Sequence, residues 1–85
     1  MREKMRRMSC IVYMLKVKPH SIDQITNRIE HMTGVRYHRS SIEKDMQLLR
    51  EEFECPIERN EQNRLVILEG YSFIEKVIEW IEFYH

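Results

Sequence analysis

The residues of this 85-residue chain best suited to bind a ligand lie between positions 36 and 44. They join basic groups to short hydroxyl side chains: Arg36, His38, Arg39, Ser40, Ser41, Glu43 and Lys44. At the start of a helix, free backbone N–H groups and the positive end of the helix dipole favour phosphate. The Arg39 guanidinium either donates to O6 and N7 of guanine or clamps a phosphate, whereas Lys44, a point charge, is better suited to phosphate. The cluster therefore predicts contact with nucleic acid, the alternative being a solvated helix start in a protein-binding domain.

Two further groups of residues carry a weaker form of this signal. Arg59, Asn63 and Arg64 lie in and around a polar turn, where they either touch DNA or form an ordinary polar hairpin tip. The four basic residues at positions 2–7 either reach a phosphate or form a solvated helix end. Both groups could enlarge the predicted nucleic-acid interface, but neither would predict one alone.

The sequence lacks the patterns that catalysis or a metal centre requires. Gly34 and Gly70 are its only glycines, so no glycine-rich phosphate loop exists, and no nucleophile elbow or paired-carboxylate signature occurs. The four histidines and two cysteines have no metal-binding spacing. We therefore expect no enzyme activity, no metal and no cofactor, and we expect Cys10 and Cys55 to be reduced, buried side chains.

Charge is balanced in total but separated along the chain. Positions 1–50 hold eleven Lys and Arg against five Asp and Glu, and positions 51–85 hold three against nine, so the two parts carry +6 and −6. This asymmetry indicates an oriented nucleic-acid partner or an oriented self-association. The apolar runs are too short for a membrane span or a secretion signal, and we expect a cytoplasmic protein.

Periodicity and capping signals predict four helices and one hairpin. The expected helices cover about 2–16, 21–33, 38–54 and the residues from 72 onward, with strands at 56–59 and 65–68. Ser21 with Gln24 forms a capping box for the second helix, and Gly34 closes it. Ser40 with Glu43 fits the same pattern in the third helix. The polar turn between the strands lacks glycine, which makes the hairpin signal moderate in strength.

The apolar faces of these helices predict a single core. The expected core residues of the first three helices are Met5, Met8, Ile11, Val12, Leu15, Ile22, Ile25, Ile29, Met32, Ile42, Met46, Leu49 and Phe53. Asp45 lies within the third helix, and we expect it to pair with a neighbouring arginine such as Arg28 or Arg36 rather than to touch DNA. The fourth helix is apolar on both sides. We expect Ile74, Val77, Ile78 and Ile81 to face inward, and Phe73, Trp80 and Phe83 to face a partner.

The stretch from Gly34 to Leu49 resembles the turn and recognition helix of the DeoR-like and WYL-associated bacterial transcriptional regulators. Those families share a Thr-Ile-x-Arg-Asp-Ile-x-x-Leu core, which corresponds here to Ser41, Ile42, Glu43, Lys44, Asp45, Met46 and Leu49. Ser41 stands where Thr is usual, and Lys44 stands where Arg is usual. The resemblance covers roughly residues 21–68 and implies a winged helix-turn-helix that binds DNA, with any small-molecule effector unknown.

Together these observations predict an α+β fold that is mainly α with a small β-hairpin. We expect a winged helix-turn-helix of three helices and a wing over residues 1–70, followed by a C-terminal helix over 71–85. The expected function is sequence-specific regulation of transcription by a homodimer, with the helix at about 38–54 in the major groove of double-stranded DNA. The expected dimerisation residues are Phe73, Val77, Trp80, Ile81, Phe83 and Tyr84. The alternative is a winged-helix adaptor of a phage, plasmid or defence system that binds proteins through its acidic half.

Overall fold

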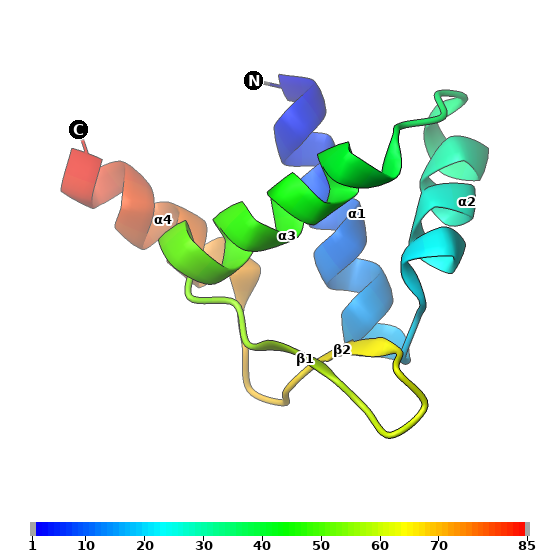
Figure 1. Ribbon diagram of the computed structural model, residues 1–85. Coiled ribbons are helices and arrows are strands. Elements are labelled where there is room, and N and C mark those ends of the chain that lie inside the picture. The colour runs from blue at the N-terminus through cyan, green and yellow to red at the C-terminus, as the bar shows by residue number, and fades with distance from the viewer. Residues whose placement is uncertain (1, 85) are drawn as a thin grey trace.

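The computed structural model describes residues 2–84, apart from the side chain of Tyr84. Its elements follow in the order α1 (Arg2–Val17), α2 (Ile22–Thr33), α3 (Arg39–Glu52), β1 (Ile57–Arg59), β2 (Leu65–Ile67) and α4 (Phe73–Tyr84). In Figure 1, α3 crosses in front of α1, the hairpin lies below them, and α2 and α4 lie on opposite sides. The described chain is therefore mainly helical with a two-stranded antiparallel hairpin, which confirms the α+β class that the sequence predicts.

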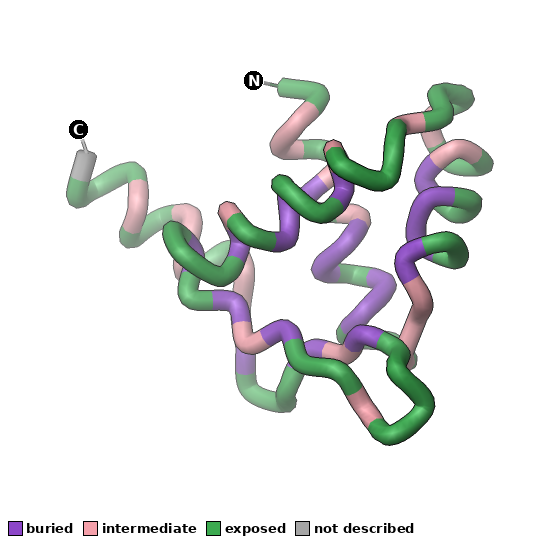
Figure 2. Tube along the Cα trace, in the orientation of Figure 1, coloured by how far each residue is buried: buried purple, intermediate pink, exposed green. Residues whose placement is uncertain are grey.

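One core lies between the first three helices and the hairpin (Figure 2). Its fully buried hydrophobic side chains are Ile11, Leu15, Ile25, Ile29, Ile42, Leu49 and Leu65. The predicted buried face of α3 is confirmed, since Met46 and Phe53 are buried as well. The prediction for Met32 is wrong, because the last turn of α2 runs past the core and leaves this side chain exposed.

The predicted boundaries of α2 are confirmed by its hydrogen bonds. Ser21 Oγ accepts from the backbone N–H of Gln24 at 3.1 Å, and the backbone N–H of Ser21 donates to Gln24 Oε1 at 2.9 Å. Gly34 adopts a left-handed conformation with φ of 78°, and its N–H donates to the carbonyl of Glu30. A residue without a Cβ adopts this conformation without strain, which explains why the helix ends at a glycine.

The predicted capping box of α3 is wrong. His38 has an extended backbone and is the N-cap, and its Nδ1 accepts from the backbone N–H of Ser40 at 3.1 Å. The chain is already helical at Arg39, so Ser40 lies inside the first turn and does not cap it. Glu43 does not reach back to the cap, because its carboxylate accepts a hydrogen bond from Arg39.

The hairpin is tied to the helices by a third extended segment. Ile57, Glu58 and Arg59 of β1 pair with Ile67, Val66 and Leu65 of β2. His20, in the connection between α1 and α2, forms a bridge to Leu65 with backbone hydrogen bonds of 3.0 and 2.7 Å. Asn63 supplies the left-handed conformation of the turn, with φ of 61°, which asparagine tolerates better than most residues. This explains how a turn without glycine closes the hairpin.

Helix α4 packs on the core with a different face from the one predicted. Phe73, Val77 and Trp80 are half-buried against the core, and the rings of Phe73 and Trp80 lie 5.4 and 5.8 Å from the ring of Phe53. Ile74, Ile78 and Ile81 are exposed by 72%, 51% and 46%. The inward prediction for these three isoleucines and the outward prediction for Phe73 and Trp80 are therefore wrong. Phe83 is exposed, as predicted, and the prediction for the Tyr84 side chain lies outside what the structure describes.

Candidate nucleic-acid interface

The first half of α3 presents most of the predicted binding residues to solvent. Arg39, Ser40, Glu43 and Lys44 are exposed, and Ser41 is half-buried. The Lys44 side chain makes no hydrogen bond or ion pair with any of residues 2–84. An unpaired ammonium group on an exposed helix face is available to a phosphate without the loss of an internal contact.

Arg39 is paired with Glu43 on the same helix face. Its Nε lies 3.0 Å from Glu43 Oε1, and the two side chains are exposed by 59% and 50%. An exposed pair at this i,i+4 spacing contributes only about 0.3–0.5 kcal/mol. A charge-assisted contact to a base or phosphate outweighs that contribution, so the pair does not prevent Arg39 from turning toward a ligand.

Arg36 is paired with residues of α2, although it lines one hollow with His38 and Arg39. Its Nη1 donates to Asn27 Oδ1 at 2.9 Å and to Glu30 Oε1 at 3.2 Å, so its guanidinium lies against α2. This arrangement braces the connection between α2 and α3. The Arg36 side chain is 54% exposed, and its predicted contact with DNA stays a prediction.

The hairpin places two arginines in different environments. Arg59 Nη1 donates to the backbone oxygen and to Oδ1 of Asn63 at 3.3 and 3.4 Å, so both residues stabilise the turn. Asn60 Oδ1 accepts from two backbone N–H groups at the turn, each at 3.0 Å. The Arg64 side chain is exposed and makes no hydrogen bond or ion pair within residues 2–84. Arg64 is thus the hairpin cation that is available to a ligand.

A buried ion pair fixes the orientation of α3. Asp45 is fully buried, and both of its carboxylate oxygens accept from Arg7 of α1, one from Nε and one from Nη2 at 3.0 Å. Lys4 Nζ lies 3.8 Å from the same carboxylate. The expectation that Asp45 pairs with Arg28 or Arg36 is therefore wrong, because α3 crosses α1 at this point and presents Asp45 to that helix.

The same contact shows that the expectation of a phosphate contact or a solvated helix end is wrong for Arg7, one of the four cations at positions 2–7, because its side chain is only 13% exposed. The Arg7 guanidinium also lies 4.4 Å from the centre of the Tyr37 ring, and the hydrogen bond to Asp45 is the main cause that raises the Arg7 pKa. Arg7 therefore holds α1, α3 and the connection before α3 together. A sequence signal existed: Arg7 is four residues before Ile11 and seven before Met14, which places this cation on the buried stripe of α1.

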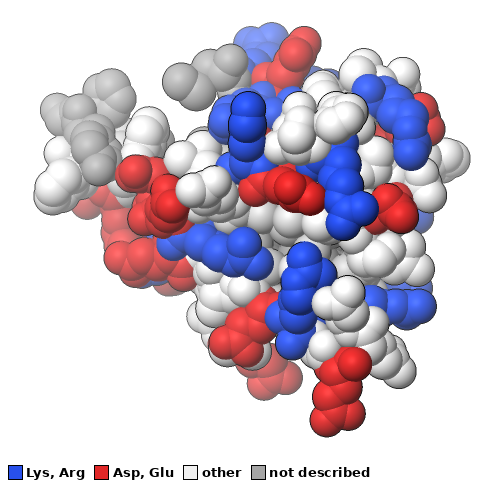
Figure 3. Space-filling view, in the orientation of Figure 1, with Lys and Arg blue, Asp and Glu red and all other residues white. Residues whose placement is uncertain are grey.

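The charge pattern of the front face is mixed rather than uniformly basic. In Figure 3, Lys and Arg atoms gather over the middle and right of the face that carries α3 and the hairpin, with acidic atoms between them. Acidic atoms predominate on the left, towards α4. Glu51 and Glu52, in the last turn of α3, are exposed. Only the first two turns of α3 are therefore electrostatically compatible with a polyanion.

The described residues give no sign of a metal site or of a membrane span. Among residues 2–84, no three His, Cys, Asp or Glu side chains are arranged to hold a metal ion. None of the four helices has both the length and the apolar character needed to cross a bilayer. Comparisons with known protein families, curated proteins and solved structures find no match. The assignment of a function therefore rests on the geometry of α3 and the hairpin.

Proposed function

We propose that the chain is a winged helix-turn-helix protein that binds double-stranded DNA and regulates transcription. In this proposal α2 and α3 are the helix-turn-helix, the first half of α3 enters the major groove, and the β1–β2 hairpin is the wing. The observation that carries the proposal is the exposed start of α3, with Lys44 unpaired and Arg39 weakly paired, held against α1 by the buried Arg7–Asp45 ion pair.

The dimensions and chemistry of α3 agree with this role. A helix with its side chains is about 10–12 Å wide, close to the roughly 12 Å width of the major groove. The Arg39 guanidinium can donate two hydrogen bonds to O6 and N7 of guanine, while Lys44 and the N-terminus of the helix can bind phosphate. Arg64 is a further exposed, unpaired cation on the wing. The acidic last turn of α3 limits the approach and so sets the tilt of the helix in the groove.

Fluorescence anisotropy with labelled duplexes of mixed genomic sequence, measured at several salt concentrations, tests this proposal. Lys44→Ala removes one phosphate contact, so the slope of log K against log salt falls in magnitude by about 0.9. Lys76→Ala is the matched control, because it removes one cation from α4, where Lys76 pairs with Glu54. Equal slopes for Lys44→Ala and the unmodified chain would overturn the placement of α3.

Glu43→Gln separates base reading from simple charge. The substitution removes a carboxylate that faces the ligand and releases Arg39. We expect tighter binding to all duplexes, roughly three- to tenfold at low salt, because one repulsive charge is lost. Weaker binding only to duplexes with cytosine at one position would show instead that Glu43 itself accepts from N4 of that base. Weaker binding to every duplex would contradict the placement of Glu43 against the ligand.

We also propose that two copies associate through α4. The exposed isoleucines at 74, 78 and 81 form an apolar ridge one turn apart, beside an acidic row at 75, 79 and 82. The exposed face of α1 offers the complement, because Arg2, Arg6, Tyr13 and Val17 are all exposed there. In a two-fold dimer, α4 of each copy then packs on α1 of the other, and the contact is made twice.

Sedimentation at tens of micromolar tests this association. Ile78→Asp places a charge in the ridge and should yield a monomer, while Arg6→Glu should weaken the dimer and its combination with Glu79→Arg should restore it. A monomeric unmodified chain would refute the homodimer. In that case the apolar ridge of α4 would be a binding surface for a different protein, as in the alternative of a winged-helix adaptor.

A further inference from the structure

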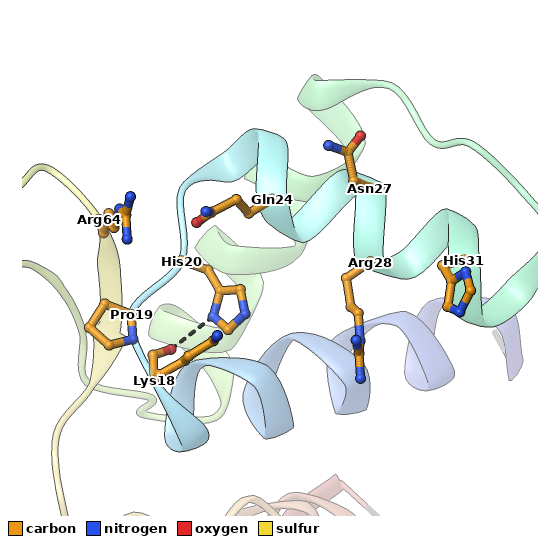
Figure 4. A pocket seen from close by; sticks show the side chains of 8 residues that line it. All are labelled: Lys18, Pro19, His20, Gln24, Asn27, Arg28, His31 and Arg64. Atoms are coloured by element: carbon orange, nitrogen blue, oxygen red, sulfur yellow. Dashed lines mark hydrogen bonds between the residues drawn. The ribbon is translucent and has the colours of Figure 1, made fainter.

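A second basic surface lies outside the α3 face. It is a groove of about 510 Å³ lined by Lys18, Pro19, His20, Gln24, Asn27, Arg28, His31 and Arg64. None of these residues belongs to α3. Figure 4 shows Arg64 and Lys18 towards one end of the groove and Arg28 and His31 along α2 towards the other.

The fold brings these residues together from three separate parts of the chain. The bridge between His20 and Leu65 joins the α1–α2 connection to β2 and so places Arg64 beside His20. Residues 24, 27, 28 and 31 follow one another at helical spacing and share one exposed side of α2. The groove is therefore a consequence of the hairpin docking against the start of α2.

The cations of this groove are unpaired. The side chains of Lys18, Arg28 and Arg64 make no hydrogen bond or ion pair within residues 2–84, and no Asp or Glu lines the groove. Other cations have carboxylate partners, as at Arg7–Asp45, Arg36–Glu30, Arg39–Glu43 and Lys76–Glu54. In a chain with as many acidic as basic residues, a concave surface with three unpaired cations and no acid selects for an anionic ligand.

The remaining lining residues suit an anion that also offers hydrogen-bond acceptors. Gln24 and Asn27 each carry an amide NH₂ group that donates two hydrogen bonds. Donors without competing carboxylates favour phosphate over a cationic or purely apolar ligand.

The length of the groove indicates a polyanion rather than one phosphate. The residues from Gln24 to His31 span about 10 Å along α2, from the 1.5 Å rise of a helix. One nucleic-acid strand carries a charge every 3.4 Å or so along the duplex axis, so this length matches about three phosphates. We propose that the groove binds the phosphodiester backbone of a nucleic-acid strand at a site separate from the α3 face. This groove proposal rests on the proposed function in one respect only: the protein must bind nucleic acid. It does not require that α3 enters the major groove.

The double variant Lys18→Ala/Arg28→Ala tests this groove, since both side chains are exposed and lie outside the hairpin. With a duplex of about 25 base pairs, the variant should bind roughly ten- to hundredfold more weakly at low salt, with a salt slope lower in magnitude by about 2. Lys44→Ala, on the other face, is measured in parallel. If the double variant binds the duplex with the affinity and slope of the unmodified chain, the groove is not a nucleic-acid site.

Two further comparisons show whether the groove binds nucleic acid or a small phosphorylated molecule, and whether the groove proposal and the α3 proposal fail separately. Tripolyphosphate is titrated against the unmodified chain and the double variant while backbone amide resonances of residues 18–31 are followed. Resonance shifts with tripolyphosphate but not with duplex would assign the groove to a small phosphorylated molecule and overturn the nucleic-acid proposal. Weaker duplex binding for the double variant with no effect of Lys44→Ala would support the groove and refute the role of α3.

Discussion

Asp45 shows at the scale of one residue what the sequence can and cannot predict. Its position within the apolar pattern of α3 correctly predicts an ion pair. Its partner is not predictable from local spacing, because Arg7 is 38 residues away and meets Asp45 only where α1 and α3 cross. Arg39 and Lys44 are different, since their exposure follows directly from the helical period that buries Ile42 and Met46.

Asp45→Asn should strongly destabilise the fold. The substitution leaves the guanidinium of Arg7, whose side chain is only 13% exposed, without its charged partner. Breaking a buried ion pair in this way costs about 3–5 kcal/mol. The free energy of unfolding in urea measures the loss.

The double variant Arg7→Met/Asp45→Leu is the control for this prediction. It removes both charges and fills the space with apolar side chains, so it should recover most of the stability that Asp45→Asn loses. If Asp45→Asn costs less than about 1 kcal/mol, the ion pair does not fix α3.

At the scale of elements, local sequence signals predict where a helix begins and ends better than they predict which side of the helix faces the core. The Ser21–Gln24 capping box and Gly34 mark α2 because both act within one helical turn. The predicted start of α3, at about residue 38, agrees with the structure, but the predicted capping residue does not, because a histidine rather than a serine supplies the capping acceptor. The rotation of α4 is not predictable from its sequence, because apolar residues surround much of this helix and their pattern alone does not say which side meets Phe53.

Two buried side chains, Cys55 and Tyr71, make the free energy of unfolding depend on pH. Burial raises the pKa of Cys55 from 9.0 to about 11 and also raises the pKa of Tyr71, whose hydroxyl donates to the carbonyl of Phe53 at 2.7 Å. Both groups stay protonated in the folded chain at a pH where the unfolded chain loses those protons. The free energy of unfolding should therefore be unaffected by these groups below pH 9 and fall between about pH 9 and 11.

Urea unfolding across this pH range checks the prediction. Cys55→Ala should reduce the decline, and Cys55→Ala combined with Tyr71→Phe should reduce it further. Cys10→Ala is the matched control, because Cys10 is only half-buried and should leave most of the decline in place. A decline of unchanged size in the double variant would show that other groups cause it.

At the scale of the whole molecule, the fold redistributes the charges that the sequence separates. The predicted division into a basic first part and an acidic second part holds for α4, but the hairpin brings Arg64 into one groove with Lys18 and Arg28. The basic residues also divide between the α3 face and the groove along α2. Sequence order could not show this division, because it depends on the bridge between His20 and Leu65.

The most direct test of DNA binding by α3 is a titration of the isotope-labelled chain with a duplex, followed by the backbone amide resonances. The proposal predicts large shifts at residues 38–44, where the helix start meets the duplex, whether or not residues 18–31 and 64 of the groove also shift, and it predicts small shifts in α4. Shifts confined to α4, or a titration without shifts at residues 38–44, would contradict it.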